Sequence, residues 1–279
     1  MRTLILLGLC AAGSLPALAE TPVTDADRER FLLEAQVVKE KGAPGGVTGS
    51  YRATLRLGDV QHDAHIQPID EYRNQMQLGS GMEIDFRDSW RNNVAAYRID
   101  RMLGLGMVPV TVTRRDPRST RLSSFTWWVD DVLMLEKDRY QKKIKPPDIV
   151  AWNRQIWVMR LFDQLIYNFD RNLGNLLIDK SWNVWMIDHT RGFKVFKDLR
   201  NEKNLADACE AGLLAKLRLL EKPTLLAATK DLLSESQVEG LLARRDRIIR
   251  IYDEKIAARG EDPVLYHLPS RMLAASASR

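Results

Sequence analysis

The chain has very little cysteine. Its 279 residues include two, Cys10 and Cys209, and we expect Cys10 to be removed with an N-terminal targeting segment. A single remaining cysteine cannot form an internal disulfide, which excludes the class of small secreted domains that disulfides stabilise. The fold must therefore be held by its apolar core, and a hydrophobic content of 45% is ample for one large domain or two lobes.

Long apolar runs are also few. The apolar stretch at residues 4–16 is too short to cross a bilayer well, and Ala17 to Ala19 follows it with the small-x-small form of a signal-peptidase site. We interpret residues 1–19 as a signal peptide, which predicts a periplasmic or secreted protein after cleavage near Ala19. Cys10 leaves a lipoprotein as an alternative. No later run is apolar enough for a transmembrane helix, so we expect no integral membrane segment.

Neither sign of charge is in large excess, since the formal net charge is +5. The basic stretches RRDPRSTR, KKIK and ARRDRIIR lack the interleaved aromatic residues of nucleic-acid-binding surfaces, so we predict no nucleic-acid partner. We expect these stretches to be solvated faces, with an acidic substrate or an anionic membrane surface as the alternative.

Alternation of apolar and polar residues predicts an antiparallel sheet in the first half of the chain. YRATLRL, residues 51–57, alternates as a strand does, and a Gly-Asp turn connects it to VQHDAHIQPI, residues 60–69. The stretch FRDSWRNNVAAYRIDR has apolar residues at helical spacing, with Asp85 as the expected cap and Gly104 as the expected end. Two more strands are predicted in MVPVTVTRR and SSFTWWVDDVLM.

The second half is predicted to be helical around one hairpin. Asp148 is expected to cap a strongly amphipathic helix. The order of elements predicts an α+β chain in two lobes, with a ligand site in the cleft between them. The predicted divisions are a signal peptide at 1–19, a β-rich N-lobe with one inward-facing helix at 20–135, a helical C-lobe that contains the hairpin at 136–268, and a disordered tail at 269–279.

The hairpin is predicted by NLLID and VWMID, two short apolar runs on either side of KSWN. Asn175 enters the first run and Asp188 leaves the second. Because antiparallel partners lie about 4.8 Å apart, the two side chains can share a small ion. Mg²⁺ prefers oxygen ligands and takes one or two of them from protein. Asp170, on the loop just before, is close enough to orient an attacking hydroxyl.

These residues also support a resemblance to known kinases. DRNLGN resembles the Asp-Arg-His-x-x-Asn catalytic loop of phosphoinositide-type kinases, and MIDHTRGF resembles their Ile-Asp-x-Gly-x-x-Phe metal segment. HipA-like kinases and the secreted casein-kinase-like enzymes of the Golgi share this pattern. The resemblance implies a two-lobed protein-kinase-like fold that binds ATP with Mg²⁺ or Mn²⁺. It implies that Asp170 is the catalytic base and that Asn175 and Asp188 hold the metal.

The sequence departs from that family at two positions. An active kinase has a lysine on its third strand that holds the α/β-phosphates and pairs with a glutamate on the following helix. Gln67 stands where that lysine is expected, and Asn93 stands where the glutamate is expected. Loss of one partner favours loss of the other, because a buried unpaired charge is costly. We expect both amides to face the nucleotide site, with Arg52, Arg56 or Arg191 as replacement cations.

Two further segments are predicted to meet the nucleotide. Gly45 and Gly46 lie in the glycine-rich stretch KGAPGGVTGS, whose backbone N–H groups are expected to cover the phosphates. Trp128 and Val129 fall where the hinge between the lobes is expected, next to adenine. Core packing is the alternative for Trp128.

The predicted function is an ATP- and Mg²⁺-dependent phosphotransferase acting on an unknown acceptor, which the sequence leaves open as protein, lipid, sugar or small molecule. A pseudokinase that binds a nucleotide or a partner without turnover is the first alternative, favoured by Gln67 and Asn93. A metal-dependent hydrolase is the second. It would draw its ligands from His62, Asp63, His65, Asp188 and His189, although His62 and His65 point to opposite faces of a strand.

Overall fold

The structure, a computed structural model, describes residues 24–42, 49–79 and 81–268. Some sequence predictions lie outside these ranges, namely the signal peptide at 1–19, the tail at 269–279, and the glycines Gly45 and Gly46. No helix within the described ranges is long and apolar enough to cross a membrane.

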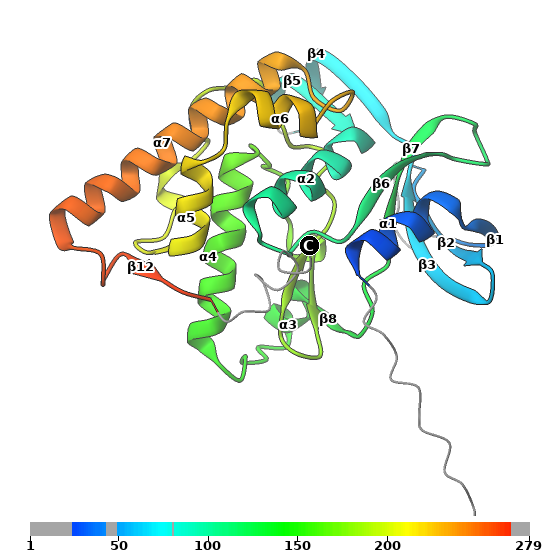
Figure 1. The fold of residues 1–279 in the computed structure, drawn as a ribbon, viewed down its shortest axis with the longest axis horizontal. Helices are drawn as coiled ribbons and strands as arrows, with labels where there is room; N and C mark the ends of the chain where they lie inside the picture. The colour runs from blue at the N-terminus through cyan, green and yellow to red at the C-terminus, as the bar shows by residue number, and fades with distance from the viewer. Residues whose placement is uncertain (1–23, 43–48, 80, 269–279) are drawn as a thin grey trace, which may run out of the picture.

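A five-stranded antiparallel sheet forms the first part of the fold, at the right of Figure 1. Its strands in spatial order are β1 (Gln36–Lys41), β2 (Tyr51–Leu57), β3 (Val60–Gln67), β7 (Leu122–Trp127) and β6 (Thr111–Arg115). Alternation sets its two faces, because Ala53 and Leu55 are fully buried while Arg52 and Thr54 lie on the opposite side. Helix α1 (Asp25–Glu34) packs on the apolar face (Figure 1).

The opposite face of this sheet is polar. The strand register places five residues in one row across all five strands: Lys41, Arg52, His65, Thr126 and Thr111. Residues that are directly opposed in an antiparallel pair project from the same face. The sheet therefore presents two cations and a histidine side by side, away from its apolar core.

A long two-stranded hairpin interrupts this sheet in sequence and leads directly into a helix. The hairpin is β4 (Asp70–Leu78) with β5 (Gly81–Ser89), and the helix is α2 (Trp90–Leu103), which crosses the centre of Figure 1. This hairpin was not predicted from the sequence. It matters for the site because its second strand ends beside the segment that contains Asp188.

Asp85 is not the cap of the helix, which corrects the sequence prediction. Asp85 lies within β5 with a φ of 52°, and its carboxylate is held by Arg87 and by the backbone N–H of Val195. The helix begins at Trp90, and Ser89 caps it because its hydroxyl accepts a hydrogen bond from the backbone N–H of Arg91. Gly104 ends the helix in the left-handed conformation, at a φ of 68°, as predicted.

The rest of the chain is mainly helical and includes a second, smaller sheet. The helices are α3 (Glu136–Gln141), α4 (Ile149–Leu165), α5 (Ala211–Arg218), α6 (Lys222–Ala228) and α7 (Glu235–Arg259), with short 3₁₀ turns η1 (Leu173–Asn175) and η2 (Glu202–Asn204). The sheet is antiparallel in the order β10 (Val184–Met186), β9 (Leu176–Asp179), β8 (Val132–Leu135). The strands β11 (Cys209–Glu210) and β12 (Leu265–Tyr266) form a parallel pair. The fold class is thus α+β, with a β-rich part followed by a helical part, as predicted.

Helix α7 holds the helical part together through one buried arginine. The Arg244 side chain is fully buried and donates hydrogen bonds to the backbone carbonyls of Leu165, Lys194 and Phe196. Burial lowers its pKa to about 9. These bonds join the end of α4 to the chain that follows Asp188. The prediction that ARRDRIIR is a solvated face therefore fails at Arg244.

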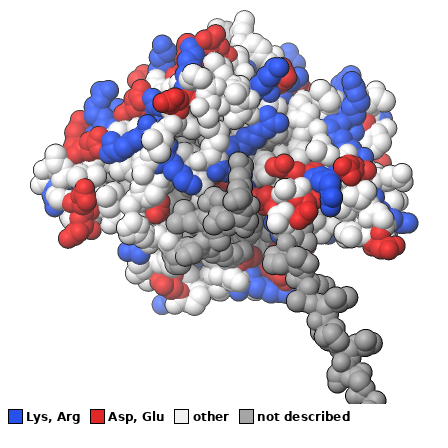
Figure 2. Space-filling model, viewed as in Figure 1, with Lys and Arg blue, Asp and Glu red and all other residues white. Residues whose placement is uncertain are grey.

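Charges of both signs are interleaved on the face of the molecule shown in Figure 2. Lysine and arginine side chains alternate with aspartate and glutamate there, with no large area of one sign. This distribution agrees with the small formal net charge of +5.

Candidate active site

The predicted hairpin is present and brings two of the predicted residues together. β9 pairs with β10 from Leu176 opposite Met186, and the backbone N–H of Ile187 donates to the carbonyl of Asn175 at 3.1 Å. Asn175 thus ends η1 at the open end of this ribbon, directly across from the residue that precedes Asp188. The two side chains named for the metal therefore start from adjacent backbone.

Asp188 has an unusual backbone conformation. Its φ is 56°, in the left-handed region that non-glycine residues rarely occupy. Such a conformation costs on the order of 1–3 kcal/mol, and the surrounding structure must impose it. The Asp188 side chain is exposed, and the Thr190 hydroxyl donates to its Oδ1 at 3.0 Å. This backbone conformation presents an exposed carboxylate at a fixed point.

Arg171 fixes the loop that contains Asp170. Its guanidinium forms a bidentate ion pair with Asp163 at 3.0 and 3.1 Å, and it donates to the carbonyls of Asn175 and Ile187. One side chain therefore joins α4, the loop and both arms of the hairpin. Its neighbour Asp170 needs this support because it lies on an irregular stretch of chain.

The electrostatic surroundings of Asp170 suit a proton acceptor. The Asp170 side chain is exposed, yet desolvation by the groups around it raises the pKa of this carboxyl. The charges of Asp188 and Glu83 raise the pKa further, and Arg191 and Arg171 oppose them. A raised pKa increases the basicity of the carboxylate, which favours accepting a proton from a hydroxyl.

Gln67 and Asn93 approach the same point from the sheet and from α2. Gln67 is buried and lies opposite Ser124 in the strand register, while the Asn93 Nδ2 donates to the Ser124 hydroxyl at 3.3 Å. The Asn93 Oδ1 accepts a hydrogen bond from the backbone N–H of His189 at 2.8 Å. Asn93 therefore connects the helix to the segment that contains Asp188.

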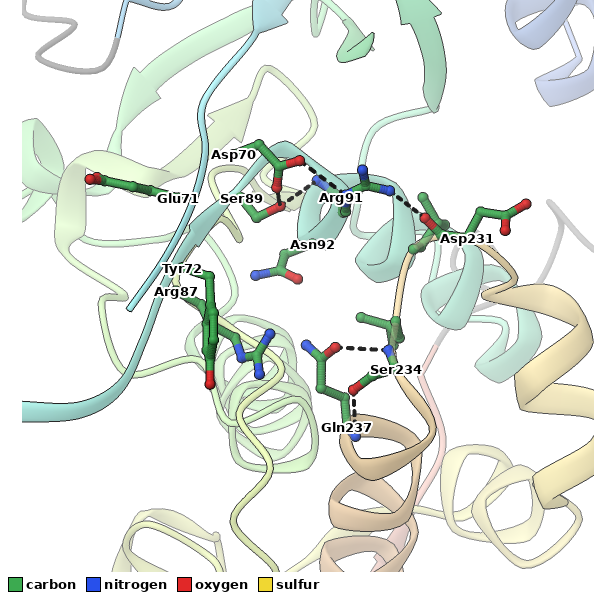
Figure 3. A pocket seen from close by; sticks show the side chains of 12 residues that line it. Asp70, Glu71, Tyr72, Arg87, Ser89, Arg91, Asn92, Asp231, Ser234 and Gln237 are labelled. Atoms are coloured by element: carbon green, nitrogen blue, oxygen red, sulfur yellow. Dashed lines mark hydrogen bonds and ion pairs between the residues drawn. The ribbon is translucent and has the colours of Figure 1, made fainter. Parts of the chain in front are cut away.

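The start of α2 is anchored at several points. Arg91 donates to Asp70 at 3.1 Å and to the carbonyl of Asp231 at 2.5 Å, and the Ser89 hydroxyl donates to Asp70 at 2.6 Å (Figure 3). These residues line a cavity of about 420 Å³ between the base of the β4–β5 hairpin and the start of α7 (Figure 3). The Asn92 amide donates from this cavity wall to the carbonyls of Thr190 and Gly192. Helix α2 and the segment that follows Asp188 are thus held in one fixed relationship.

A larger cavity lies on the polar face of the five-stranded sheet. It has a volume of about 580 Å³, within the usual range for small-ligand sites, and its wall includes Lys41, Arg52, Asp63 and Trp128. The Arg52 guanidinium lies 4.0 Å from the centre of the Trp128 ring. Trp128 is therefore not a core residue, and its side chain faces a cavity at the end of β7, before the chain crosses to β8. Val129, beside it, is buried.

Asp63 organises the charges in this cavity. Its carboxylate accepts hydrogen bonds from Lys41 at 2.8 Å, from Arg52 at 2.6 Å and from the Thr54 hydroxyl at 2.6 Å. Burial raises the pKa of Asp63, but these bonds outweigh it and lower the pKa to about 2. Sequence reasoning missed the clustering of Lys41 and Asp63. The register of β1, β2 and β3 creates it, and one strand read alone does not show it.

The residues present fit a small divalent cation. The Asn175 side chain forms no hydrogen bond with the described residues, so its amide oxygen is available as a ligand beside the exposed Asp188 carboxylate. One amide and one carboxylate match the one or two protein oxygens that Mg²⁺ usually takes. Within the described ranges no group of three or more His, Cys, Asp or Glu side chains could hold a metal ion.

The histidines do not assemble as the hydrolase interpretation requires. His62 stacks on Trp127 and contacts Asp130, whereas His65 projects from the opposite face of the strand. His189 is fully buried, and burial lowers its pKa well below the ordinary value. The site therefore offers oxygen ligands, with no compact set of imidazole ligands among the described residues.

The fold is that of an atypical protein kinase. It has a β-rich part, a connection at Trp128, and a helical part that contains the Asp170 loop and the hairpin after it. Among solved structures, that of a hydra Fam20 with sugar matches with a TM-score of 0.66 at 14% identity, over 89% of this chain and 94% of that chain. Two structures of the Golgi casein kinase, one of them with Mn/ADP bound, each match with a TM-score of 0.59 at 14% identity. Each match covers 88% of this chain and 80% of that chain. At this identity the likeness establishes the fold. No protein-family model matches the sequence, and no curated protein does either.

Proposed function

We propose that this protein is an atypical kinase that transfers the γ-phosphoryl group of ATP to a hydroxyl acceptor with Mg²⁺ or Mn²⁺ as cofactor. The observation that supports this most directly is the meeting of Asn175 and Asp188 at the open end of one hairpin, beside the Asp170 loop. The similar Golgi casein kinase binds Mn/ADP, which supports the same cofactors here.

Each residue of this site has a role that its geometry supports. Asn175 and Asp188 would hold the cation, which neutralises charge on the β- and γ-phosphates when bound. Asp170 accepts the proton of the acceptor hydroxyl, because its raised pKa makes it a better base than an ordinary carboxylate. Arg171 holds the loop in place. Most of the rate gain then comes from positioning and electrostatic stabilisation.

The nucleotide would occupy the 580 Å³ cavity on the polar face of the sheet. The Trp128 side chain forms part of its wall, where the chain crosses between the two parts of the fold. Lys41 and Arg52 supply positive charge on the wall of this cavity. Gln67, which stands at the expected lysine position, is neutral and supplies none. Arg52 projects from the same face as Gln67, one strand away, so it is the replacement cation that the sheet register favours. Gly45 and Gly46 would cover the phosphates.

A pseudokinase is the second candidate, and one observation favours it. Neither Gln67 nor Asn93 is charged, and Asn93 is hydrogen-bonded to Ser124 and to the backbone of His189. A chain with this pair keeps the arrangement of helix and metal segment but lacks the usual phosphate-binding lysine. Such a protein would bind nucleotide or a partner and would not turn it over.

The sequence supports an exported compartment and leaves the acceptor open. We propose that the protein acts after export, in a periplasm or outside the cell, because residues 1–19 have the form of a signal peptide. A hydroxyl on a protein, a lipid, a sugar or a small molecule fits the chemistry equally well. The hydra Fam20 structure contains sugar, which makes saccharides the first acceptors to test.

The experiment is a thermal-shift series on the purified mature chain with ATP, ADP and GTP, each with Mg²⁺, Mn²⁺ or a chelator. Stabilisation that requires both nucleotide and metal supports the site. Transfer of labelled γ-phosphate to a panel of saccharides, peptides and lipids then separates an active kinase from a pseudokinase. Nucleotide binding without any transfer favours the pseudokinase, and no binding under any condition contradicts both.

A further inference from the structure

Strand β5 ends beside the metal segment. The backbone N–H of Ser89 donates to the carbonyl of Thr190 at 3.0 Å, which joins the last residue of the strand to the chain two residues after Asp188. Asp88 is therefore brought next to this segment by the hairpin. Asp88 is separated from Asp188 by a hundred positions in sequence and belongs to a hairpin that the resemblance does not involve.

One hydroxyl lies between two carboxylates. The Thr190 hydroxyl donates to Asp188 Oδ1 at 3.0 Å and also interacts with Asp88. A hydroxyl has a single proton, so it cannot satisfy both groups. The Oδ1 atom of Asp88 is buried and has no hydrogen-bond partner among the described residues. A carboxylate oxygen in that situation is costly to keep unless a cation or a donor meets it.

The cations nearby are already engaged by another acid. Arg191 and Lys194 both form ion pairs with Glu83, and Lys194 also donates to the carbonyls of Ile84 and Asp85. Burial raises the pKa of Asp88, and the charges of Asp188 and Glu71 raise it further, which outweighs the lowering by the Thr190 hydroxyl and by Arg191. Among the described residues no lysine or arginine forms an ion pair with Asp88. The fold thus keeps an extra acid beside Asp188 without supplying its counter-charge.

We propose that Asp88 is a third protein ligand of the divalent cation at Asn175 and Asp188, directly or through a bound water. This inference rests on the proposed function in one respect, namely that the cation there is Mg²⁺ or Mn²⁺. With Asp88 the site has two carboxylates and one amide. One divalent cation neutralises the negative charges of the two carboxylates. Such a site binds the metal without nucleotide, whereas a site of one carboxylate and one amide depends on the phosphates for most of its ligands.

The test is a Mn²⁺ titration of the mature chain without nucleotide. The electron paramagnetic resonance signal of free Mn²⁺ measures how much of the metal is bound. The variants are Asp88→Asn and, as a matched control, Glu71→Gln, which changes the acid directly opposite Asp88 on β4. We expect Asp88→Asn to weaken Mn²⁺ binding at least tenfold and Glu71→Gln to change it less than twofold. Equal affinity in Asp88→Asn and the unchanged chain overturns the proposal, as does absence of nucleotide-free Mn²⁺ binding in the unchanged chain.

A thermal melt separates a ligand from a structural residue. In chelator, Asp88→Asn should melt at the same or a higher temperature, because it removes an unsatisfied buried charge, and it should lose the stabilisation that Mn²⁺ gives the unchanged chain. Marked destabilisation in chelator with an unchanged Mn²⁺ response indicates a structural acid and overturns the proposal. If the unchanged chain transfers no phosphate but its Mn²⁺ binding still depends on Asp88, only the proposed kinase activity is contradicted.

Discussion

The side-chain oxygen of Asn93 accepts a hydrogen bond from the backbone N–H of His189 at 2.8 Å. This bond joins helix α2 to the residue that follows Asp188, so the helix sets where the segment that contains Asp188 lies. A neutral amide makes this connection here, where a kinase of the usual type has a glutamate paired with a lysine.

Restoring the charged pair tests whether Gln67 and Asn93 are coupled. Asn93→Glu alone places an unpaired carboxylate in a buried site and should lower the free energy of unfolding by about 3 kcal/mol. Adding Gln67→Lys should recover most of that loss and should tighten ATP binding about tenfold. Urea denaturation and calorimetric titration of both variants give the two readouts. No recovery in the double variant would show that the two positions do not face each other.

Removal of the metal ligand tests the site itself. Asp188→Ala should abolish metal-dependent nucleotide binding while the fold stays intact, because the carboxylate is exposed and its one described hydrogen bond is to Thr190. In chelator, the same substitution should leave the melting temperature unchanged or raise it, since it removes a negative charge from a crowded acidic site. Unchanged Mg²⁺-dependent binding by calorimetry would remove the metal role of Asp188.

Asp170 should set the acid limb of the pH–rate profile. A base works only when deprotonated, and the pKa of Asp170 lies above the ordinary aspartate value of 3.8. Activity should therefore rise with pH through an apparent pKa higher than 3.8 and should be lost as pH falls through it. Asp170→Asn should reduce kcat at least a hundredfold with little effect on ATP binding. A profile that is flat down to pH 4 contradicts this role.

Asp63 should contribute stability that depends on pH. Its folded-state pKa of about 2 lies below the ordinary value of 3.8, so this stability is present above pH 4 and is lost as pH falls from about 4 toward 2. The contribution is about 2 kcal/mol from a shift of this size. Asp63→Asn should lower the free energy of unfolding at pH 7 and flatten its pH dependence in that window. The comparison is by urea denaturation at pH 7 and pH 3, with Asp130→Asn as an exposed control.

Gly240 should be required for packing of α7. A Cβ there would lie 2.8 Å from the carbonyl oxygen of Val195 and 3.1 Å from Arg244 Nη1, and backbone cannot move aside easily. Gly240→Ala should therefore destabilise the fold by about 1–3 kcal/mol, although alanine is the better helix former by about 1 kcal/mol. Thermal unfolding checks this, with Gly212→Ala in α5 as a milder case because its neighbour is a flexible side chain.

Sequence patterns that depend on near neighbours predicted much of this structure. The alternation in YRATLRL predicted β2, and Asp148 caps α4 through two backbone N–H groups, as expected. The hairpin around KSWN formed as expected, because short apolar runs, a turn and their register are all local. The roles of Asp170, Asn175 and Asp188 stay predictions, although the structure brings the last two to one point.

The failures have a common cause. Asp85 has the right residue type for a helix cap, but Arg87 and the Val195 N–H occupy its carboxylate, so Ser89 caps instead. Arg244 is charged yet fully buried, because three carbonyls from distant segments converge on it. In both cases the partner lies far away in sequence, and no local pattern contains it.

The sequence by itself determined the α+β class, the order of the elements apart from the β4–β5 hairpin, and the presence of an Asp–Asn–Asp set around one hairpin. Periodicity and turn chemistry specify such features within a few residues. Tertiary structure alone decided that Lys41, Arg52 and Asp63 share a cavity, and that Asp88 meets the segment of Asp188. Those relationships depend on which strands pair and on where a hairpin ends, and packing of distant segments sets both.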